Sequence, residues 1–154
     1  AYLGKPRKRQ VLYNPKKGLD VTKRIMAELQ GEKFFPIENM TVSEVKALME
    51  ESMLYIDFGN HPGKDRIPRE AAMCGCCVIT NREGSANNFR DVPIPEQYKY
   101  RTSCMDGIKT EIRLILDHYE FCKSDFRQYR EIIKSEKARF KYGVSRLVDK
   151  LREV

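Results

Sequence analysis

The sequence predicts an α/β fold, in which a doubly wound parallel sheet is followed by two long carboxyl-terminal helices. In the first half of the chain, short apolar segments alternate with amphipathic segments. The apolar segments are nearly continuous rather than alternating with polar residues, which is typical of parallel strands that helices cover on both faces. In the second half, apolar residues recur at helical spacing over two long stretches.

Each apolar segment of the first half is an expected strand. These segments are residues 10–13, 34–37, 53–58 and 76–80. Apolar residues recur every four positions from Val21 to Leu29, which predicts a helix with Asp20 as its amino-terminal cap. Further on, Thr41-Val42-Ser43-Glu44 forms a capping box, which predicts the start of a second helix.

A third helix is expected over residues 68–74, because a proline opens this segment and a glycine follows it. Residues 81–101 are polar and contain prolines, which indicates a loop. The spacing of apolar residues over 108–122 predicts a long helix opened by Ser103. A final helix is expected over residues 126–151.

Basic residues are concentrated at the amino end. The 154 residues carry a net charge of +7 at pH 7, and residues 1–24 hold eight basic residues against one acid. We therefore divide the chain into a basic segment, residues 1–9, and a single domain, residues 10–154. Such a segment could bind nucleic acid, an anionic membrane or a pyrophosphate, or remain a solvated tail. The sequence favours nucleic acid least among these ligands, because only Tyr2 and Tyr13 supply aromatic rings nearby.

Composition also limits the class of protein. Hydrophobic residues at 41% and charged residues at 33% indicate a folded rather than a disordered chain. No apolar run approaches the ~20 residues that span a bilayer. Without a secretion signal, the expected location is the cytoplasm, with peripheral attachment to a membrane as a further option.

The chain has five cysteines, an odd count that does not suit a disulfide framework. Reduced thiols are therefore expected. The cysteines lack paired C-x-x-C spacing, and only two histidines are present, so no metal site is predicted. Cys76 and Cys77 are expected to pack in a core strand as small hydrophobic residues.

The carboxyl ends of parallel strands meet at one edge of a sheet, and ligands of such folds bind there. The polar loop after the strand at 53–58 is rich in glycine and proline and leads into the helix at 68–74. A loop that feeds a helix amino terminus suits a phosphate or a sugar hydroxyl. His61 in this loop is a candidate general acid or base, or a contact to a sugar hydroxyl.

Charged side chains at the same edge could hold a diphosphate. The cations are Lys16 and Lys17 after the first strand and Arg66 and Arg69 at the third helix. Glu70 could accept hydrogen bonds from a ribose diol, or it could be a surface carboxylate that complements the helix dipole. The small residues after Glu83 would let backbone N–H groups approach a ligand, or form a simple turn. Residues 14–18 match neither the dinucleotide-binding nor the P-loop pattern.

Residues 70–79, Glu-Ala-Ala-Met-Cys-Gly-Cys-Cys-Val-Ile, resemble the E-A-M-A-x-G-x-P-V-V block of retaining GT-B glycosyltransferases. Lys17-Gly18 is similar to the K-G of that family's diphosphate-binding turn, and Glu83-Gly84 to the glycine turn after the next strand. The resemblance covers residues 10–90 or so. It implies the Rossmann-like carboxyl-terminal half of such an enzyme, which binds the nucleotide sugar.

By this resemblance, the protein would transfer a sugar from a nucleoside diphosphate sugar to an acceptor, without a further cofactor. Glu70 would bind the ribose hydroxyls, and Lys16 or Lys17 would bind the diphosphate together with Arg66. The full nucleotide-sugar site implied comprises Lys16, Lys17, Gly18, Arg66, Arg69, Glu70, Glu83 and Gly84. An amino-terminal acceptor domain would be the missing partner.

Two other functions stay open. The family often has a glutamate eight positions before the one equivalent to Glu70, and here that position is Pro62. This difference favours a degenerate glycosyltransferase-like module that binds or interacts without catalysis. The second alternative is a nucleic-acid-binding domain that uses the basic amino end.

Overall fold

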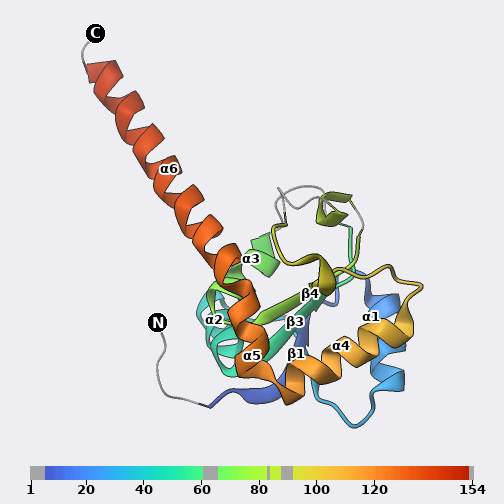
Figure 1. The fold of residues 1–154 in the computed structure, drawn as a ribbon. Helices are drawn as coiled ribbons and strands as arrows, with labels where there is room; N and C mark the ends of the chain where they lie inside the picture. Colours follow the sequence, from blue (N-terminus) through green and yellow to red (C-terminus); the bar gives the residue numbers. More distant parts are fainter. Residues whose placement is uncertain (1–5, 61–65, 83, 88–91, 153–154) are drawn as a thin grey trace.

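The computed structural model describes residues 6–60, 66–82, 84–87 and 92–152. Within these residues the strands form a four-stranded sheet in the order β2-β1-β3-β4 (Figure 1). The strands are β1 (Lys8–Tyr13), β2 (Phe34–Pro36), β3 (Ser52–Asp57) and β4 (Cys77–Thr80). All neighbouring strands are parallel, which confirms the α/β class and the parallel sheet predicted from the apolar segments.

Helices lie on both faces of the sheet. The first three are α1 (Leu19–Glu28), α2 (Val42–Glu51) and α3 (Arg66–Met73). Helix α2 contacts α3 and both pack on β3, whereas α4 (Met105–Asp117) packs on β3 and contacts α1 (Figure 1). The chain leaves β1 in one direction to form β2 and later returns past β1 to form β3. The direction of winding therefore reverses between β1 and β3, where open α/β sheets bind ligands.

The start of α1 differs from the prediction. Asp20 lies in the first turn, and the residue at the cap is Gly18, whose φ of 59° is in the left-handed region. A Cβ atom on Gly18 would lie 2.1 Å from the carbonyl oxygen of Phe58, so only glycine fits there. At α2 the prediction is confirmed, because the Thr41 hydroxyl accepts a hydrogen bond from the backbone N–H of Glu44 at 3.2 Å.

The prediction of a single helix over residues 108–122 is wrong. Helix α4 is followed by a separate short helix, α5 (Tyr119–Lys123), and His118 between them has φ −132° and ψ 45°, outside the helical region. The Tyr119 hydroxyl donates a hydrogen bond to the carbonyl oxygen of Gly75 at 2.6 Å. This contact fixes α5 against the end of α3, a position that a straight continuation of α4 would not provide.

The last helix, α6 (Arg127–Arg152), extends away from the sheet and its covering helices (Figure 1). Its first part packs against α3, where Tyr129 and Ile133 are buried. Its far part exposes the apolar side chains of Leu147 and Leu151. Among the described residues, no helix combines the length and the apolar composition that crossing a bilayer requires.

The residue at the amino-terminal cap of α4 is Cys104, one position after the predicted cap, Ser103.

The strands supply the centre of the core, and their burial on both faces explains their continuous apolar sequence. Val11, Leu12, Leu54, Val78 and Ile79 are each fully enclosed. Cys76 and Cys77 are also fully buried, as predicted for small core residues. Burial raises the pKa of the Cys76 thiol to about 12, so this thiol stays protonated and unreactive at neutral pH.

Arg7, at the amino edge of the sheet, is bound to the backbone of two helix ends. Its guanidinium donates hydrogen bonds to the carbonyl oxygens of Met49 and Ser52, both at 2.8 Å, and to that of Cys74. Met49 lies in the last turn of α2, and Cys74 follows α3 directly. Carbonyl groups at helix ends lack partners within the helix and carry partial negative charge. Arg7 therefore holds α2 and α3 to the start of β1.

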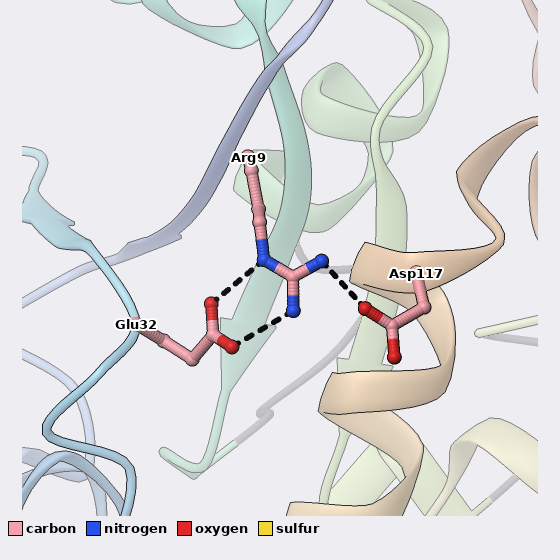
Figure 2. A network of polar contacts seen from close by, with 3 residues as sticks. All are labelled: Arg9, Glu32 and Asp117. Carbon is pink, nitrogen blue, oxygen red and sulfur yellow. Dashed lines mark hydrogen bonds and ion pairs between the residues drawn. The ribbon is translucent and has the colours of Figure 1, made fainter.

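Arg9 makes a second connection at this edge (Figure 2). Its guanidinium binds both carboxylate oxygens of Glu32, at 3.0 and 2.8 Å, and one oxygen of Asp117 at 2.6 Å. These two carboxylates, Glu32 first, raise the pKa of Arg9 above its usual range. Glu32 precedes β2 and Asp117 ends α4, so Arg9 joins three separate segments. The folded structure thus includes residues 7–9 of the predicted basic segment.

Candidate ligand site at the carboxyl edge of the sheet

The turn between β1 and α1 presents Lys16 and Lys17 beside the point where the winding reverses. Asn14 shapes this turn, because its side-chain oxygen accepts a hydrogen bond from the N–H of Lys16 at 3.0 Å. Its carbonyl oxygen accepts another from the N–H of Lys17, also at 3.0 Å. Gly18 then starts α1 directly against the end of β3. The side chain of Lys16 is exposed and that of Lys17 is half-buried.

The end of β3 lies against this turn. A Cβ atom on Gly59 would lie 2.6 Å from the Cβ of Lys17, so the two loops are in direct contact. Asp57 is buried at the end of β3 and accepts hydrogen bonds from the Tyr55 hydroxyl at 2.8 Å and the Gly59 N–H at 3.1 Å. Asn81, just after β4, is buried too and donates to the Gly59 carbonyl at 2.8 Å. These polar groups fix the backbone of the β3 loop.

Asp57 and Asn81 were not among the predicted site residues. Asp57 is the single acidic residue within the apolar run 53–58, and Asn81 follows Val78-Ile79-Thr80 at the start of a polar stretch. Their position at the end of a buried strand is the one signal that could have identified them. A polar group buried there destabilises the fold unless it is hydrogen-bonded, so it is expected to have a specific partner.

Glu70, the predicted ribose contact, lies on α3 and forms an ion pair with Arg66. The Arg66 Nε donates to a Glu70 carboxylate oxygen at 2.7 Å, and this hydrogen bond raises the pKa of Arg66. The side chains are 83% and 45% exposed, respectively. An ion pair this exposed contributes little to stability, so either side chain can exchange its partner for a ligand at small cost.

Arg69 lies apart from Arg66. Its guanidinium donates a hydrogen bond to the carboxylate of Glu136 on α6, and both side chains are largely buried. Arg69 therefore belongs to the contact between α3 and α6, whereas Arg66 and Glu70 lie on the exposed side of α3.

Two predicted site residues, His61 and Glu83, lie outside the described residues. Gly84 begins a short 3₁₀ turn, Gly84–Asn87, close behind β4. Within the described parts of the chain, no three His, Cys, Asp or Glu residues gather closely enough to hold a metal ion. The described groups at this edge can offer cations, backbone N–H groups and a carboxylate to a ligand.

No model of a known protein family matches this chain, and no curated protein matches it significantly.

Proposed function

We propose that the chain is the nucleotide-sugar-binding domain of a glycosyltransferase of the GT-B kind. The observation that carries the proposal is the point between β1 and β3 where the winding reverses. There, the Lys16-Lys17-Gly18 turn packs against the β3 loop at the edge where such sheets bind nucleotides. Glu70 and Arg66, on the exposed side of the helix that follows β3, supply a carboxylate and a cation.

The proposed mechanism uses these groups in two ways. Lys16, Lys17 and Arg66 neutralise the diphosphate, whose negative charge increases as the bond to the sugar breaks. Glu70 leaves Arg66 and accepts hydrogen bonds from the two hydroxyls of the ribose. An acceptor domain supplied elsewhere would complete the active site, because transfer needs the second substrate beside the donor. A cytoplasmic location accords with the five free thiols.

The proposal is tested by calorimetry of the protein with UDP, GDP and ADP. We expect one of these nucleotides to bind, and Glu70→Ala and Lys16→Gln each to weaken it at least about tenfold, or about 1.4 kcal/mol. Arg113→Gln, an exposed change on α4, is the matched control and should bind normally. If none of the three nucleotides binds, or if Glu70→Ala binds as the unchanged protein does, the proposal is wrong.

The second candidate is a degenerate module of the same fold that binds a partner without catalysis. The ion pair between Arg66 and Glu70 favours it, because the proposed ribose contact already has a partner in this structure. Nucleotide binding that survives Glu70→Ala would favour this alternative. Nucleic acid binding through the amino end has less support, since Arg7 and Arg9 are engaged with carbonyl and carboxylate groups of the protein itself.

A further inference from the structure

An open hollow of about 270 Å³ lies beyond β4, lined by Arg82, Asn87, Arg101 and Thr102. Arg82 comes two residues after β4. On the other side, Lys99 forms a parallel bridge with Thr80, and the Tyr100 N–H donates to the Thr80 carbonyl at 2.9 Å. The hollow therefore lies at the carboxyl edge of the sheet, and none of its lining residues belongs to the site described above. Its volume is slightly below the roughly 300–1,000 Å³ of typical small-molecule sites.

Among the residues that the structure describes, cations outnumber acids around this hollow. One carboxylate, that of Glu96, accepts a hydrogen bond from Arg82 at 2.7 Å and lies 3.8 Å from the ammonium group of Lys99. Arg82 lowers the pKa of Glu96, so this carboxylate is charged at neutral pH. Among the described residues, Arg101 forms no ion pair, and its side chain is exposed. Counting these four described groups alone, two positive charges are left uncompensated.

Lys99 is the most unusual of these four charged residues, because it is buried. Its side chain is 0% exposed, and its Nζ atom has no hydrogen-bond partner. A buried ammonium without hydrogen bonds destabilises a folded protein, and a methionine of similar length would avoid that cost. Burial accordingly lowers the pKa of Lys99. Its ammonium group lies beside Glu96 and close enough to Arg82, a lining residue, to feel that charge, so Lys99 adds to the positive charge around the hollow.

We propose that this hollow binds a phosphoryl group carried on a small organic molecule. Arg101 and Arg82 would contact the phosphoryl oxygens, because the planar guanidinium donates two parallel hydrogen bonds to such a group. Asn87 and Thr102 add neutral donors at the same surface. Lys99 acts through its charge, without direct contact, since its Nζ atom is enclosed. The proposal does not depend on nucleotide binding between β1 and β3.

The test titrates the protein with inorganic phosphate and with glycerol phosphate, using glycerol and sodium sulfate as controls. Binding is followed by the NMR signals of the arginine Nε–H groups and by the melting temperature. We expect saturable shifts of the Arg82 and Arg101 signals with a dissociation constant of about 1 mM or lower. The Arg113 signal should not move, and glycerol should have no effect. An equal response to sulfate would mean an unselective anion surface and would overturn the proposal.

Three variants identify the residues. Arg101→Gln, at an exposed position, should lower the affinity for glycerol phosphate at least about tenfold without a change in melting temperature. Lys99→Met should lower the affinity several-fold, and yet raise the melting temperature of the free protein. Arg113→Gln should behave as the unchanged protein. Unchanged phosphate binding in Arg101→Gln, or the absence of saturable shifts in the unchanged protein, overturns the proposal. Glu70→Ala separates the two sites, because it should affect nucleotides alone.

Discussion

The two edges of the sheet both carry basic residues, but Arg7 and Arg9 at the amino edge differ from Lys99 and Arg101 at the carboxyl edge. At the amino edge, Arg7 and Arg9 are matched by carbonyl and carboxylate oxygens at hydrogen-bond distance. At the carboxyl edge, Lys99 is buried without a hydrogen bond and Arg101 is exposed without a described ion pair.

This difference separates two roles that sequence alone cannot distinguish. A cation that donates several hydrogen bonds to the protein itself contributes to stability and has less left for a ligand. For a buried cation without hydrogen bonds, such as Lys99, the cost of desolvation exceeds the gain from its ion pair with Glu96 at 3.8 Å, so it reduces stability. Substitutions of Arg7 and Lys99 should therefore change the free energy of unfolding in opposite directions.

The largest effect is expected at the amino edge. Arg7→Met should lower the free energy of unfolding by about 3 kcal/mol, because it leaves three carbonyl oxygens at two helix ends without their charged donor. Urea denaturation measures the change. Lys8→Met is the control, since Lys8 is 64% exposed and makes one ion pair with Glu51 at 3.4 Å, and it should change stability by no more than about 0.5 kcal/mol. Equal stability of Arg7→Met and the unchanged protein would contradict this account.

At the carboxyl edge, Lys99→Met should raise the free energy of unfolding by about 2 kcal/mol at neutral pH, because it removes a buried charge without hydrogen bonds. The pKa of Lys99 is lowered in the folded protein from the usual 10.5. The unfolded chain therefore binds the proton more tightly, and stability rises as the pH passes from the folded to the unfolded pKa. Urea denaturation at neutral pH and near pH 10.5 should show the advantage of the variant shrinking, and a constant advantage would argue against a buried charge.

A smaller effect is expected for Arg9. Its side chain is 43% exposed, so solvent weakens the pairs with Glu32 and Asp117, and Arg9→Gln should cost about 1 kcal/mol. In 1 M salt, where charges are screened beyond about 3 Å, most of this difference should disappear. The loss in Arg7→Met should persist, because its bonds are to partly buried carbonyl groups. Urea denaturation of both variants at low and high salt makes the comparison, and an equal salt response would contradict it.

Much of the fold was predictable because its signals are local. Continuous apolar runs indicated all the described strands, and the Thr41 capping box indicated the start of α2. The break at His118 was not predicted, and the hydrogen bond that Tyr119 makes after it reaches Gly75, 44 residues away in the sequence. Residues 7–9 could be interpreted from sequence as a solvated tail, because the carbonyl oxygens that bind Arg7 belong to Met49 and Cys74, far away in the sequence.

The candidate site was predictable only in outline. The order of strands and loops indicated the carboxyl edge, and the structure brings Lys17 against the β3 loop there. The partner of each arginine on α3 was not predictable from the sequence. Arg66 and Glu70, four residues apart on α3, pair on its exposed side, whereas Arg69 turns to α6. The cationic hollow was not predicted, because Arg82, Lys99 and Arg101 all belong to residues 81–101, which the sequence indicated only as a loop. Nothing in the sequence showed that the two ends of this segment lie close together.

The outer rim of β2 has one more consequence. The Ile37 N–H and the Lys33 carbonyl bond to β1, so the backbone groups of Pro36 face away from the sheet. Proline has no N–H there to offer, and β2 is only three residues long. A second polypeptide cannot readily add itself as a further strand on that side, which guards the molecule against fibrous aggregation at high concentration.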